Sequence, residues 1–75
     1  MKLTEQKIIL IIETVFKQKE DSITLATPLE DFAKDSIDIM EFIAILKNKH
    51  NVVIEPTEIT KLTNVKEIVS YVLSH

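Results

Sequence analysis

A serine flanked by carboxylates is the part of this sequence that is best suited to take part in chemistry. The stretch Asp35-Ser36-Ile37-Asp38-Ile39-Met40-Glu41 places that serine where a helix is expected to begin. Asp35 suits the N-cap position, because its carboxylate can accept hydrogen bonds from free backbone N–H groups of the first turn. Ser36 then takes the first helical position with its hydroxyl outward. No histidine lies near enough in sequence to activate it, so we expect another protein to modify this hydroxyl.

The residues after the serine form two pairs at helical spacing. Asp38 and Glu41 are separated by three residues and so share a helix face, and Ile37 and Met40 form a second pair with the same spacing. Ala44 follows one turn after Met40 on the same flank. A hydroxyl at a helix tip, beside acids and two apolar groups, is typical of a surface that other proteins recognise, although Met40 could also fill the core.

This stretch resembles the modification site of acyl carrier proteins, whose pattern is Asp-Ser-Leu-Asp followed by a short gap and Glu. The residues that match are Asp35, Ser36, Asp38 and Glu41, with Ile37 in place of leucine. The resemblance implies that Ser36 bears a covalent 4′-phosphopantetheine arm, which a phosphopantetheinyl transferase attaches from coenzyme A. It implies a carrier of acyl thioesters for fatty-acid, lipid or polyketide-type biosynthesis, with no catalytic site of its own.

The resemblance also implies partners, namely acyl-loading, acyl-transfer or condensing enzymes with basic docking patches. On this interpretation the acids Asp35, Asp38 and Glu41 meet lysine or arginine of the partner, and charge sets the rate and orientation of encounter. The residues expected to make apolar contacts with the bound partner are Ile37, Met40 and Ala44. Two alternatives stay open: an aminoacyl or peptidyl carrier of a specialised pathway, and an unmodified helical docking module.

Length and charge limit the other possibilities. The 75 residues predict one domain over 1–75, expected to be monomeric, and the absence of cysteine excludes disulfides and thiolate metal sites. The formal net charge is −3, and residues 20–41 hold seven acidic side chains against the single Lys34. Such an acidic middle argues against a nucleic-acid surface. Asp35, Asp38 and Glu41 lack the glycine and the spacing of a calcium loop, so no metal site is predicted.

No segment reads as a membrane span or as a secretion signal. The longest unbroken apolar run, Ile8 to Ile12, is far too short to cross a bilayer. The cytoplasm is therefore the expected location.

Hydrophobic periodicity and capping residues predict three main helices. Thr4 is the expected N-cap of the first, in which Glu13 and Lys17 are expected to pair on the outside. The second is expected from Ser36 to about Lys49, and the last is opened by a capping box at Asn64-Val65-Lys66-Glu67. These elements must position the serine-containing stretch.

The connections between these helices carry their own signals. Residues 17–27 read as a long loop, followed by a capping box at Thr27-Pro28-Leu29-Glu30 that predicts a short helical turn. Val52 to Ile54 is expected to be extended, and a short third helix is expected from Pro56 to about Leu62. A chain without glycine must place asparagine, aspartate or a costlier residue wherever φ is positive. The predicted fold is all-α, a small bundle of three main helices plus one short helix, with a long loop between the first two.

Overall fold

The first helix begins and ends through local signals. In the computed structural model, which describes residues 3–74, α1 runs Glu5–Val15 and Thr4 caps it by accepting a hydrogen bond from the Lys7 N–H at 3.2 Å. After the helix Lys17 has φ 58°, and the Gln18 N–H donates to the Glu13 carbonyl at 2.8 Å. This is a Schellman ending, in which a lysine occupies the left-handed position that usually belongs to glycine.

The remaining helices are α2 (Ser36–His50), α3 (Pro56–Ile59) and α4 (Val65–Leu73). Asn51 has φ 57° where α2 ends, so asparagine takes a left-handed position as predicted. Helix α3 is shorter than the predicted Pro56 to about Leu62. The chain continues after Ile59 in three-residue turns, with the Leu62 N–H donating to the Ile59 carbonyl at 3.2 Å.

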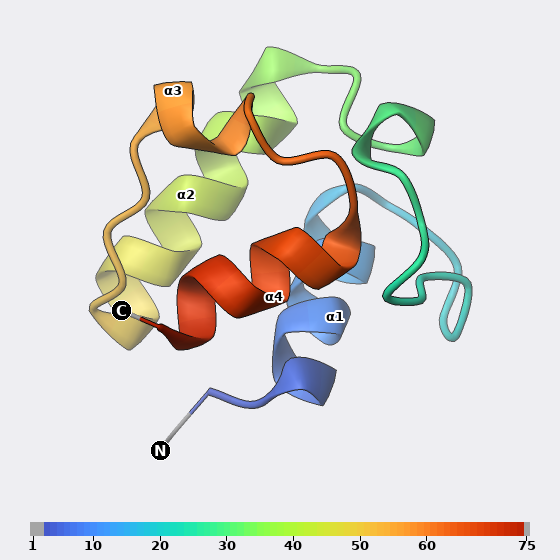
Figure 1. The fold of residues 1–75 in the computed structure, drawn as a ribbon, viewed down its shortest axis with the longest axis horizontal. Helices are drawn as coiled ribbons and strands as arrows, with labels where there is room; N and C mark the ends of the chain where they lie inside the picture. The colour runs from blue at the N-terminus through green and yellow to red at the C-terminus, as the bar shows by residue number, and fades with distance from the viewer. Residues whose placement is uncertain (1–2, 75) are drawn as a thin grey trace.

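The helices form a small bundle in which α1 packs against α2 and α4, while α2 also packs against α3. Figure 1 shows α4 crossing the middle of the molecule, and the long connection from α1 to α2 running down one side. This architecture confirms the predicted all-α class with three main helices, one short helix and a long first connection.

The core is apolar, and in it the Phe16 ring contacts the rings of both Phe32 and Phe42. The Phe16 and Phe32 ring centroids lie 5.0 Å apart with the rings edge to face, and those of Phe16 and Phe42 lie 5.9 Å apart. Because Phe32 precedes α2 and Phe42 lies within it, these contacts hold the start of α2 against the end of α1. The other buried apolar residues are Ile8, Ile12, Val15, Ile23, Leu46, Val52, Ile54, Ile59, Val65, Ile68, Val69 and Val72.

Glu13 corrects one sequence prediction. It does not pair with Lys17 on the outside: only 5% of its surface is exposed, and Oε2 accepts a hydrogen bond from the Ile23 N–H at 3.2 Å. Ile23 lies in the long connection and is itself buried. The pairing prediction was wrong because Lys17 leaves the helix with positive φ, while the connection folds back over Glu13.

The predicted capping box at Thr27 is a second correction. Pro28 is extended and stands before the short 3₁₀ helix η1 (Leu29–Asp31), which has no side-chain cap. The Thr27 hydroxyl instead accepts a hydrogen bond from the Thr24 N–H at 2.9 Å. The backbone here pairs with the segment before α4, since the Leu29 N–H donates to the Thr63 carbonyl at 3.0 Å. Tertiary pairing thus replaced the local cap.

The start of α4 is held by both halves of a modified capping box. The Asn64 side chain accepts from the Glu67 N–H at 3.0 Å, as predicted. The Glu67 carboxylate, however, accepts from the Thr63 N–H at 2.6 Å and from the Thr63 hydroxyl at 2.8 Å. These hydrogen bonds from the Thr63 backbone and side chain favour the charged carboxylate and lower the pKa of Glu67.

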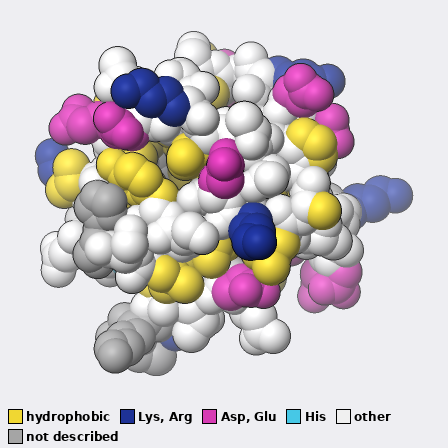
Figure 2. All heavy atoms as spheres, in the orientation of Figure 1, with side chains coloured by type: hydrophobic (Ala, Val, Ile, Leu, Met, Phe, Trp, Pro, Cys, Tyr) yellow, Lys and Arg dark blue, Asp and Glu magenta, His cyan; other side chains and the backbone are white. Residues whose placement is uncertain are grey.

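The surface is mixed in character. Figure 2 shows lysine and acidic side chains scattered among hydrophobic ones over the face that Figure 1 presents. Among residues 3–74, no helix is long and apolar enough to cross a membrane.

Candidate functional site

The serine-containing stretch forms the N-terminus of α2, as predicted. Asp35 is the N-cap, with extended backbone, and its Oδ1 accepts from the Ile37 N–H at 2.9 Å. The first backbone hydrogen bond of the helix joins the Ile39 N–H to the Asp35 carbonyl at 3.2 Å. Because the Asp35 side chain uses only the Ile37 donor, the N–H groups of Ser36 and Asp38 stay available at the positive end of the helix.

Ser36 is the first residue of α2 and is exposed. Within the described part of the chain its hydroxyl makes no hydrogen bond to another protein group, so no protein donor or acceptor competes for Oγ. The residues that could position it are the cap Asp35 on one side and the first turn of α2 on the other. An accessible alcohol beside backbone donors suits the attachment of a phosphate ester.

Three apolar side chains lie exposed on the outer face of α2. Ile37 is 73% exposed and Met40 53%, and Ala44 is exposed as well. Neither the isoleucine nor the methionine belongs to the buried core. The structure therefore brings Ile37, Met40 and Ala44 together with Ser36 on one face.

The acids do not share that face equally. Glu41 is exposed, whereas Asp38 is half-buried. With 3.6 residues per turn, Asp38 lies about 160° around α2 from Ser36, so it is on the other side of the helix. The seven predicted residues thus surround the first half of α2 rather than forming a single patch.

A cavity of about 290 Å³ lies beside this end of α2. Ile39 and Phe42 of α2 line it, together with the segments around η1 and α3. The other lining residues are Phe16, Leu29, Glu30, Phe32, Ala33, Ile59, Thr60, Leu62 and Ile68. Ala33 and Ile39 lie three residues before and after Ser36, which places the cavity next to the candidate attachment point.

The lining of the cavity is mostly apolar. Its polar side chains, Glu30 and Thr60, are both exposed residues and so belong to the rim. The sequence pattern did not indicate a space between Leu29, Phe32, Ile59 and Leu62. Apolar periodicity indicates individual core positions, whereas the void depends on how the end of α1, η1, α2, α3 and α4 pack together.

A known protein family matches most of the chain. A family model described as "Phosphopantetheine attachment site" matches residues 6–72. The chain therefore belongs to the phosphopantetheine-attachment family of carrier domains, as the sequence resemblance indicated. Members of this family carry covalently attached 4′-phosphopantetheine, and they interact with a phosphopantetheinyl transferase and with partner enzymes.

Proposed function

We propose that Ser36 is the attachment point of the 4′-phosphopantetheine arm and that the protein is an acyl carrier. The observation that carries this proposal is an exposed, unbonded serine hydroxyl at the first position of α2, next to a mostly apolar cavity of about 290 Å³. When bound, the arm supplies a terminal thiol on which acyl groups are held as thioesters. The protein would deliver them to enzymes of fatty-acid, lipid or polyketide-type biosynthesis.

The residues around Ser36 fit the phosphodiester that attachment creates. The backbone N–H groups of Ser36 and Asp38 and the positive end of a fifteen-residue helix favour an anion there. Asp35 adds negative charge nearby, but its carboxylate is engaged with the Ile37 N–H. We infer that the acids Asp35, Asp38 and Glu41 serve the encounter with basic partner surfaces, while Ile37, Met40 and Ala44 supply short-range contact.

The cavity supports an acyl rather than an aminoacyl cargo. Its inner lining is made of isoleucine, leucine and phenylalanine side chains, and its polar groups lie at the rim. A hydrocarbon chain loses nothing by entering such a space, whereas a charged ammonium group would lose its hydration without a partner. A single carrier domain without catalysis of its own, in the cytoplasm, stays the prediction for the chain.

The test of Ser36 is intact mass after incubation with coenzyme A and a broad-specificity phosphopantetheinyl transferase. We expect a gain equal to one phosphopantetheine group, which Ser36→Ala abolishes. Ser70→Ala, at an exposed serine of α4, is the matched control and should still gain the group. An unchanged mass of the wild-type chain, or a gain that persists in Ser36→Ala, would overturn the proposal.

The test of the cargo follows on the loaded protein. Acyl-activating and aminoacyl-activating enzymes are each offered the same sample, and thioester formation is read by mass. We expect acyl groups to be accepted. Loading by aminoacyl-activating enzymes alone would favour the specialised-carrier alternative.

A further inference from the structure

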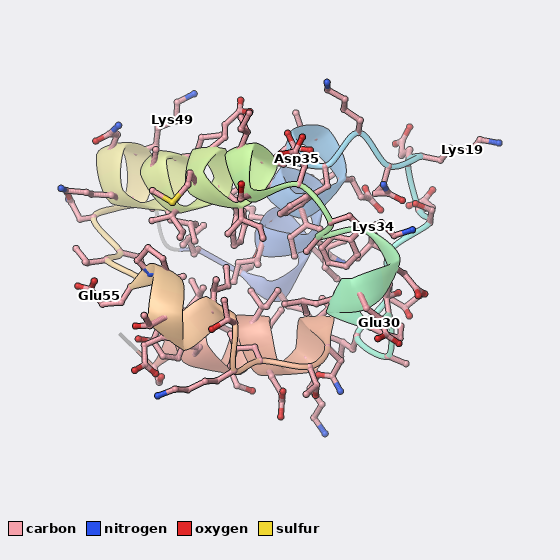
Figure 3. The ribbon with its side chains drawn as sticks, turned by 90° about the horizontal axis from the view of Figure 1, so that it is seen from above. Lys19, Glu30, Lys34, Asp35, Lys49 and Glu55 are labelled. Atoms are coloured by element: carbon pink, nitrogen blue, oxygen red, sulfur yellow. The ribbon has the colours of Figure 1, made fainter. Side chains whose placement is uncertain are left out.

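The charge on α2 changes sign along its length. Asp35, Asp38 and Glu41 lie at its start, whereas Lys47 and Lys49 lie in its last turn. Figure 3 shows Asp35 and Lys49 at opposite ends of α2, both directed away from the bundle. The exposed apolar residues Ile37 and Met40 alternate with these acids, and Ala44 follows them one turn later. Along its length α2 is therefore acidic and apolar in its first half and basic at its end, and Asp35 is the acid that adjoins Ser36.

Lys47 shares the strip that contains Ser36. With 3.6 residues per turn, Met40 is rotated by about 40° and Lys47 by about 20° from Ser36 around the axis of α2. The rise per residue places Lys47 about 16 Å along the helix from Ser36. Lys47 is exposed, as are Ser36 and Met40, so a molecule that contacts the serine along this strip also meets the lysine.

Lys49 lies on a different side of the same helix end. It is rotated by about 160° from Lys47. It lines a groove between α1 and α2 together with Leu10, Ile11 and Ile45. The two lysines therefore have equal charge and a similar place near the helix C-terminus, but only Lys47 faces the same way as Ser36.

Within the chain the two lysines have no acidic partner among residues 3–74. The ion pair found there joins Lys61 and Glu58 at 3.8 Å, and Glu55 in the segment after α2 pairs with neither lysine. Both lysines interact favourably with the negative end of the helix. That effect is the same for Lys47 and Lys49, so it does not explain why one of them lies in line with Ser36.

We propose that the enzymes which receive this carrier have a dipolar docking surface, with basic groups beside Ser36 and a carboxylate that pairs with Lys47 about 16 Å further along α2. The inference rests on the proposed function, since it names the kind of partner that reads the Ser36 face. A uniformly basic surface would be repelled at Lys47, so the lysine would exclude partners built for an entirely acidic helix.

Two synthetic helical peptides serve as probes for this surface. Both carry leucines along one face and arginines at one end; the first has glutamates at the other end, and the second has arginines there too. Binding to the full chain is followed by NMR chemical shifts. Net charge alone favours the second peptide, because the protein carries −3. We expect the first to bind more tightly by at least about threefold, as for an exposed ion pair, with shifts along α2.

Matched variants separate local pairing from net charge. Lys47→Glu should reverse the order of binding affinity of the two peptides. Lys49→Glu makes the same charge change at the same helix end and should leave that order unchanged. Lys47→Gln should abolish the preference without reversing it, and circular dichroism reports folding for each variant. Tighter binding of the all-arginine peptide, no detectable binding of either at millimolar concentration, or equal effects of Lys47→Glu and Lys49→Glu would overturn the proposal.

This outcome is independent of the Ser36 assignment. Loading is measured separately by intact mass, and peptide binding is measured on both apo and loaded protein. If the protein does not load but clearly prefers the dipolar peptide, only the assignment of Ser36 as the attachment site is contradicted. If the protein loads normally but shows no such preference, only the proposed docking surface is contradicted.

Discussion

The buried carboxylate of Glu13 in α1 accepts a hydrogen bond from the backbone N–H of Ile23 in the connection to α2, with 3.2 Å between Oε2 and N. Both residues belong to the interior, with 5% and 6% of their surfaces exposed. The bond joins the middle of a long connection to the core. It thereby helps to fix the route by which the chain reaches η1 and the start of α2.

Replacement of Glu13 should destabilise the fold by an amount that depends on the acceptor. Glu13→Ala leaves the Ile23 N–H buried without a partner and should cost about 1–3 kcal/mol of unfolding free energy. Glu13→Gln keeps an acceptor oxygen and should cost clearly less. Urea unfolding followed by circular dichroism measures both, with Glu20→Ala at an exposed position as the control. Equal losses in the alanine and glutamine variants would contradict this role of the hydrogen bond.

A glycine at position 17, where φ is positive, should stabilise the protein. Lys17 has φ 58°, which costs a residue with a side chain about 1 kcal/mol that glycine does not lose. Lys17→Gly should therefore raise the unfolding free energy by about 0.5–1 kcal/mol. Lys19→Gly, in the same connection without positive φ, should give no gain. The idea fails if the two glycine variants behave alike in chemical denaturation.

The Glu67 carboxylate should make stability depend on acid pH. Its pKa is lowered in the folded state by the hydrogen bonds from Thr63, so its contribution is fully present above the ordinary carboxyl pKa of about 4.3. The contribution is lost as the pH falls through the lower folded value. Melting temperatures between neutral and acid pH should therefore drop less steeply in Glu67→Gln. Parallel curves of melting temperature against pH for the variant and the wild type would contradict this role of Glu67.

Charge reversal at Asp38 should slow modification more than it changes folding. Asp38 is half-buried on the first turn of α2, two residues from Ser36, so a lysine there would repel a basic transferase surface during encounter. We expect Asp38→Lys to reduce the modification rate by about tenfold or more, mainly through association. Glu20→Lys makes the same charge change on an exposed loop and should have a much smaller effect. The rate is read by intact mass over time, beside circular dichroism; equal slowing in both variants would assign the effect to net charge.

The sequence by itself determined the features that depend on a few neighbouring residues. The caps at Thr4, Asp35 and Asn64 were predictable because each side chain bonds to a donor two or three residues away. The bounds of α2 followed from its cap and its periodic apolar positions. The need for asparagine or aspartate at positive φ followed from the lack of glycine, and Asp21 and Asn51 meet it.

Only the tertiary structure decided the features that depend on distant segments meeting. Glu13 is buried because the connection folds back over it, and Pro28 stands outside η1 because its neighbours pair with the segment before α4. The cavity beside Ser36 exists because α2, η1 and α3 pack without filling the space between them. Local propensities act within one turn, whereas burial and voids arise when separate segments compete for the same core, so no short stretch of sequence specifies them.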